Sequence, residues 1–125
     1  MSGIFVEDTD TFFIVVCYEE NDKEIKILES NQTGGKSLKV TFKYPDFATS
    51  QTVLNASMIQ GSNGELNLNM LRLNSNILYM LAKSWDAKDA KGNPIPIADG
   101  INKLRIEIAK ALIEKLVERL GTNII

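Results

Sequence analysis

The N-terminal part of the chain is dominated by one apolar stretch, FFIVVCY at residues 12–18. Most of its residues are aromatic or β-branched, as in β-strands, and it lacks the polar alternation of a strand with one wet face. A strand of this kind is usually covered on both faces, so we expect it at the centre of a sheet. The alternative is that one of its faces docks a partner, with Phe12, Phe13 and Val15 as candidate contacts.

Two further β-type runs follow, EIKILE at residues 24–29 and SLKVTFKY at residues 37–44. The connections between the three runs are NDK and SNQTGGK, and both are rich in turn-forming residues. Short connections of this composition favour neighbouring strands joined by hairpins. We therefore predict an antiparallel β-meander within residues 1–44.

Part of the second connection, GGKS at residues 34–37, resembles the end of a phosphate-binding loop. The first glycine of that loop would fall on Ser30, and the loop would have to open a helix. Residues 37–44 instead have the two-residue period of a strand. We expect GGKS to form a hairpin turn and predict no nucleotide site.

The pattern changes at Pro45 and Asp46, because proline removes a backbone donor and Asp is a favoured helix N-cap. A first helix is predicted to begin near Phe47 and to end at Gly61, which tolerates the positive φ of a helix C-terminus.

Two longer helices are predicted over residues 66–85 and 101–120, the latter capped by Asp99, because apolar residues recur three or four positions apart. The fold class is thus α+β, a small N-terminal antiparallel β-meander packed with about three C-terminal α-helices. The 125 residues form a single domain with a β-rich part, 1–44, and a helical part, 45–125.

The last predicted helix is apolar over more than one stripe. One stripe contains Leu104, Ile108, Leu112, Leu116 and Leu120, of which we take the last three as candidate partner contacts. A second set, Ile106, Ile113 and Val117, widens the apolar surface beyond a coiled-coil seam. We therefore expect this helix to pack against more than one neighbour, with another subunit as one candidate.

Residues 85–100, WDAKDAKGNPIPIADG, connect the two longer helices. A calcium loop starting at Asp86 would place Lys88 and an alanine at ligand positions, so we predict no metal site. We expect a turn at residues 91–93 and an extended segment laid over apolar surface, with Trp85 and Ile95 as candidates for that contact. The same two residues are also candidate partner contacts.

Composition narrows the classes of function. The net charge is −2 with interspersed charges, which is unlike a nucleic-acid-binding surface, and no apolar run approaches the length of a membrane span. The chain has no histidine, and its single Cys17 lies in an apolar strand. We therefore expect no enzyme activity, no cofactor and no membrane or nucleic-acid partner, and a protein made for a reducing compartment.

One pattern resembles a known family. A helix ending in Trp85 and Asp86, a turn with Gly92, a segment flanked by Pro94 and Pro96, and a final amphipathic helix are similar to tail assembly chaperones of tailed bacteriophages. The resemblance covers about residues 40–120.

The resemblance implies a chaperone that coats the long helical tape measure protein, in the host cell cytoplasm, before the tail tube forms. The alternative within the same biology is a structural virion component of tail, baseplate or neck that oligomerises through its β-edge and terminal helix. A small enzyme or ligand-binding domain is the third class, and it would need a pocket of convergent polar groups. In the first two cases we expect a protein partner and a homo-oligomer.

Overall fold

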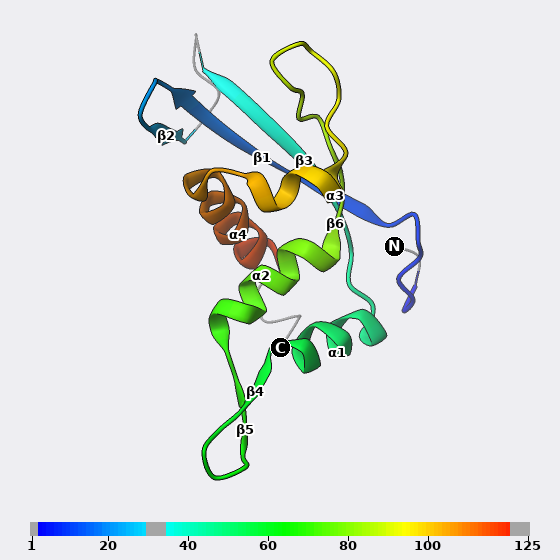
Figure 1. Ribbon diagram of the computed structural model, residues 1–125. Helices are drawn as coiled ribbons and strands as arrows, with labels where there is room; N and C mark the ends of the chain where they lie inside the picture. Colours follow the sequence, from blue (N-terminus) through cyan, green and yellow to red (C-terminus); the bar gives the residue numbers. More distant parts are fainter. Residues whose placement is uncertain (1–2, 30–34, 121–125) are drawn as a thin grey trace.

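The computed structural model describes residues 3–29 and 35–120 and has the α+β architecture expected from the sequence (Figure 1). Helices pack on one face of a four-stranded antiparallel sheet, and a small hairpin extends away from it. The elements in chain order are β1 (Thr11–Glu20), β2 (Ile25–Leu28), β3 (Lys36–Lys43), α1 (Phe47–Ala56), β4 (Met58–Gln60), β5 (Leu66–Leu68), α2 (Met70–Leu81), β6 (Ala82–Trp85), α3 (Ile97–Gly100), the 3₁₀ helix η1 (Ile101–Lys103) and α4 (Ile106–Leu120).

The FFIVVCY stretch lies inside the sheet, as expected, in the strand order β2-β1-β3-β6. β3 pairs with β1 from Thr11 to Tyr18, and β2 pairs with it only from Cys17 to Glu20. The predicted meander is therefore wrong in its strand order, because β2 and β3 lie on opposite sides of β1. A ten-residue strand has two long edges, so β2 and β3 can each pair with a different edge of β1.

The strand order also decides whether the GGKS segment closes a hairpin. Lys36 and Ser37 already belong to β3, which confirms that a strand and not a helix follows the glycines. Because β2 and β3 are not neighbours, the segment does not close a hairpin between them, and this part of the prediction is wrong. The rest of the connection, residues 30–34, lies outside the described residues.

The two faces of the sheet differ in burial. Val16, Val40 and Phe42 have no exposed surface and face the helices, in the same cluster as residues of α1, α2 and α4. Phe13 points to the opposite face, because side chains alternate along a strand, and it is 60% exposed. The expectation that both faces of FFIVVCY are covered is thus wrong at Phe13.

The first helix begins where predicted and ends earlier. The Asp46 carboxylate accepts a hydrogen bond of 2.7 Å from the Thr49 N–H, which confirms the N-cap. The helix ends at Ala56 and not at Gly61, because residues 58–60 pair with residues 66–68 in the β4–β5 hairpin.

The two longer helices are also shorter than predicted. Residues 66–68 belong to β5, Asn69 caps α2 by accepting from the Arg72 N–H at 3.0 Å, and residues 82–85 leave α2 to form β6 beside β3. The last helix begins at Ile106 because Leu104 has an extended backbone, ψ 143°. Asp99 lies inside α3 and makes no cap, so that prediction is wrong.

Candidate partner-binding groove

Four of the residues expected to contact a partner lie in the hydrophobic core. Leu112 and Leu116 have no exposed surface, Leu120 is 4% exposed and Phe12 is 7% exposed. All four pack in one cluster with residues of β3 and α2. A partner reaches them only if the core opens, so in this structure they stabilise the fold.

Phe13 and Val15 lie on the outer face of the sheet. The Lys39 Nζ stands 4.4 Å from the centre of the Phe13 ring, and Val15 is half-buried opposite Lys39. Along Thr11–Val16, β3 pairs with one edge of β1, and no described strand pairs with the other. This half of β1 therefore offers an open edge in the part of the chain that the structure describes.

The predicted contact between Trp85 and Ile95 is present. The Trp85 indole N–H donates to the Ile95 carbonyl at 2.6 Å, and both side chains are half-buried. A Cβ built on Gly100 would lie 2.6 Å from the Trp85 ring and 2.9 Å from Ile95, so glycine is needed for this approach. Gly92 takes a φ of 84° in the turn that returns the chain. Trp85 and Ile95 thus anchor the connection between helices, leaving only part of their surface open.

An apolar groove of about 670 Å³ lies between α2 and α4. Its apolar wall comes from α4 residues one or two turns apart and from the first turn of α2. The lining residues are Leu71, Asn74, Ser75, Ile106, Ala109, Lys110, Ile113, Glu114 and Val117.

The groove residues are unusually exposed for apolar side chains. Leu71 is 81% exposed, Ile106 63% and Val117 39%, whereas Ile113 is half-buried at the base. Burying such surface against a partner is favourable by about 25 cal/mol per Å². An apolar strip with polar margins is the usual mark of an interaction site.

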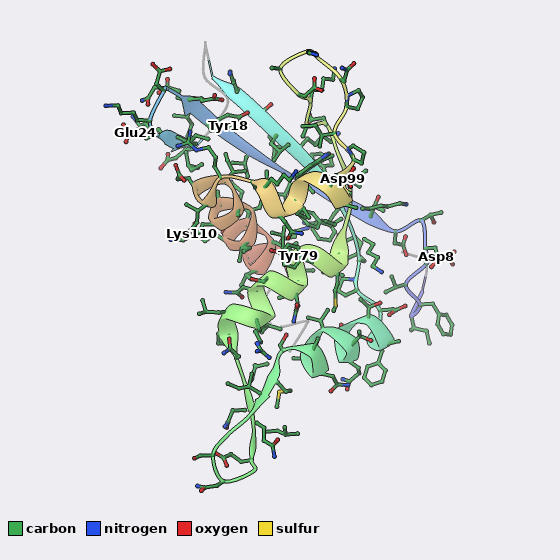
Figure 2. The ribbon with its side chains drawn as sticks, in the orientation of Figure 1. Asp8, Tyr18, Glu24, Tyr79, Asp99 and Lys110 are labelled. Atoms are coloured by element: carbon green, nitrogen blue, oxygen red, sulfur yellow. The ribbon has the colours of Figure 1, made fainter. Side chains whose placement is uncertain are left out.

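Two opposite charges stand on one margin of the groove. Lys110 and Glu114 are four residues apart on α4, so they lie one turn apart on the same side of the helix. Figure 2 shows Lys110 on the open side of α4. Within the described residues, neither of them is paired with an opposite charge inside 4.0 Å.

The sequence contained a signal for this groove. Ile106, Ile113 and Val117 are the second apolar set of the last helix, and the structure leaves them at the surface beside α2. Leu71 had no such signal, because it precedes the core residue Leu73 in an apolar run. Only the position of α2 against α4 brings it to the groove.

Among the described residues, three carboxylates have pKa values lowered by backbone hydrogen bonds, and two of them, Asp46 and Asp10, cap a helix or a turn. The Thr49 backbone N–H, with the Thr49 hydroxyl, lowers the pKa of Asp46, and the Glu7 N–H lowers that of Asp10. The pKa of Glu107 is lowered by its own backbone N–H, by the Ile25 N–H and by Arg105. These shifts follow from hydrogen bonds that hold the fold.

Residues 3–29 and 35–120 contain no cluster of three or more Cys, Asp or Glu side chains placed to hold a metal ion. The helices within those ranges are also too short or too polar to cross a membrane.

No protein-family model, curated protein or solved structure matches the chain.

Proposed function

We propose that this chain is a non-enzymatic bacteriophage tail assembly protein, a chaperone that binds the long helical tape measure protein. The observation that carries the proposal is the exposed apolar groove between α2 and α4. In this proposal the protein acts in the host cell cytoplasm while the tail is assembled, and it needs no cofactor.

The dimensions of the groove suit an amphipathic helix. Its apolar strip runs from Ile106 to Val117, which at 1.5 Å per residue is about 16 Å, or three helical turns. An amphipathic helix places apolar side chains on one face at i, i+3, i+4 and i+7, and such a face lies naturally in a groove between two helices. A tape measure protein offers this face many times along its length.

The core supports binding by a preformed groove. Leu112 and Leu116 fix α4 against the sheet, while Ile113 and Val117 on the same helix face the groove. The α4 wall of the groove is therefore anchored in the core before a client arrives, which limits the conformational entropy lost on binding.

A structural virion component is the second candidate, and one observation favours it. Along Thr11–Val16, one edge of β1 has no strand partner within residues 3–29 and 35–120, and it offers backbone N–H and C=O groups to a strand of another subunit. The other sheet edges, β2 and β6, have only four residues each, so they extend the sheet poorly.

Two measurements test the proposal. Overlapping helical segments of the tape measure protein of the same phage are titrated against the wild-type chain and against Ile113→Gln and Phe13→Ser. We expect binding that Ile113→Gln weakens at least tenfold and Phe13→Ser leaves unchanged. Loss of binding only in Phe13→Ser would assign the client to the sheet, and no binding by any segment would contradict the chaperone function.

The second measurement separates the two candidates. The protein is quantified by mass spectrometry in infected-cell lysate and in purified particles, relative to the tail tube protein. A chaperone is present in lysate and missing from particles. Stoichiometric presence in particles would make the chain a structural subunit.

A further inference from the structure

We propose that the free protein is an antiparallel homodimer in which α4 of a second copy fills the groove, and that a helical client displaces this copy. The dimer is independent of the proposed function, whereas the displacement rests on it. The occupant is inferred from the charges on the margin of the groove.

The apolar strip of α4 is suited to pairing with itself. Ile106 and Val117 stand at its two ends and Ile113 near its centre. If a two-fold axis crosses α4 midway between residues 106 and 117, Ile106 of each copy lies level with Val117 of the other. In such an isologous contact, both copies use the same surface patch, so the assembly stops at the dimer.

The charges select the antiparallel orientation. With that axis, Glu114 of the second copy lies level with residue 109, so it is one residue, about 1.5 Å along the axis, from Lys110. A two-fold axis perpendicular to the helices also keeps the charged margins of both copies on the same side of the contact. Each dimer thus contains two symmetric Lys110–Glu114 pairs between copies.

A parallel arrangement does not form these pairs. A two-fold axis along α4 would place Lys110 level with Lys110 and put the two charged margins on opposite sides of the contact. Lys110 and Glu114 then remain without partners across the interface. The opposite charges of Lys110 and Glu114 therefore favour the antiparallel dimer over the parallel one.

The groove also explains why dimer and client exclude each other. Both would use Leu71, Ile106 and Val117, the three most exposed apolar residues of the lining. In the free dimer this surface is covered, which protects the chain from non-specific association. A client with many matching helical turns competes with a single short helix, because its segments rebind at high local concentration.

The first test is sedimentation equilibrium of the full chain across a wide concentration range. We expect a monomer–dimer equilibrium for the wild type and monomer for Ile113→Gln. The matched control is Tyr79→Gln, which removes an apolar side chain of α2 that is 49% exposed and lies outside the groove lining. Wild-type protein that stays monomeric at the highest concentration, or a dimer unaffected by Ile113→Gln, would overturn the proposal.

Charge reversal tests the orientation. Lys110→Glu and Glu114→Lys each place two like-charged pairs across the antiparallel contact, so each should raise the dimer Kd about tenfold. The double variant, and an equimolar mixture of the two single variants, restore opposite charges and should dimerise like the wild type. If neither the mixture nor the double variant recovers the dimer, the antiparallel contact is wrong. Far-UV circular dichroism confirms that each variant is folded.

Displacement is measured by titrating tape measure segments of the same phage into the dimer. We expect complexes that contain one copy of the chain. A complex that contains the intact dimer would overturn the displacement and leave the chaperone function standing. A dimer that forms normally but binds no segment would instead contradict the proposed function, and the displacement with it.

Discussion

Two neighbouring residues of α4, Leu116 and Val117, are predicted to respond in opposite ways to the same kind of substitution. Leu116 has no exposed surface and belongs to the main core cluster, whereas Val117 is 39% exposed in the groove. Leu116→Ala leaves a cavity and should lower the free energy of unfolding by about 3 kcal/mol. Val117→Ala loses little burial and gains helix propensity, so it should change that free energy by less than about 0.5 kcal/mol.

Urea unfolding followed by far-UV circular dichroism measures both effects. With an m-value of about 1.5 kcal/mol/M, the Leu116→Ala midpoint should fall by about 2 M while the Val117→Ala midpoint stays near that of the wild type. The protein is studied at the lowest practical concentration, because a dimer would make stability depend on concentration. Equal losses in the two variants, or a Leu116→Ala midpoint unchanged from wild type, would refute the assignment of the two faces of α4.

Three other predictions test the fold. Gly100→Ala places a Cβ 2.6 Å from the Trp85 ring, so overpacking should lower the free energy of unfolding by about 1–3 kcal/mol and change the tryptophan fluorescence. Ser57→Ala removes the acceptor of the Asn76 side-chain amide, 3.0 Å away, and should cost about 1–2 kcal/mol in urea unfolding. The pKa of Asp46 is lowered in the folded state, so its stabilising effect is present above its unfolded pKa and is lost as the pH falls below about 4. Asp46→Asn keeps the cap without this titration, so its stability should match wild type at pH 7 and fall less on acidification.

The features that sequence predicted correctly are those set by local chemistry. Asp46 begins α1 because its carboxylate meets a free N–H of the first helical turn, whatever the rest of the fold does. The FFIVVCY run becomes an inner strand because most of its apolar side chains are more stable when removed from water. The apolar stripe of α4, from Ile108 to Leu120, follows from helical periodicity, whereas its place in the core does not.

The errors concern pairing between distant segments. Residues 66–68 and 82–85 continue the helical apolar pattern of α2, yet both form strands. Residues 66–68 pair with residues 58–60 across a turn, and residues 82–85 pair with β3, which is distant in the chain. Asn63-Gly64 is a hairpin signal in the connection between the first two predicted helices, and the prediction did not use it; Gly64 has a φ of 84°. The strand order depends on which edge of β1 is filled by which strand, and no local pattern specifies that choice.

The sequence predicts the two apolar stripes of α4 but not which of them lines the candidate site. Helical periodicity separates α4 into two apolar stripes and does not say which stripe meets the sheet. The sequence predicts Leu112 and Leu116 as partner contacts, whereas the structure buries them in the core and leaves Ile106 and Val117 exposed, with Ile113 half-buried. The leucines pack in the core, whereas the exposed side chains of Ile106 and Val117 do not belong to that cluster. Substitutions of exposed groove residues should therefore impair association and leave folding intact. Substitutions of core residues should instead lower the free energy of unfolding.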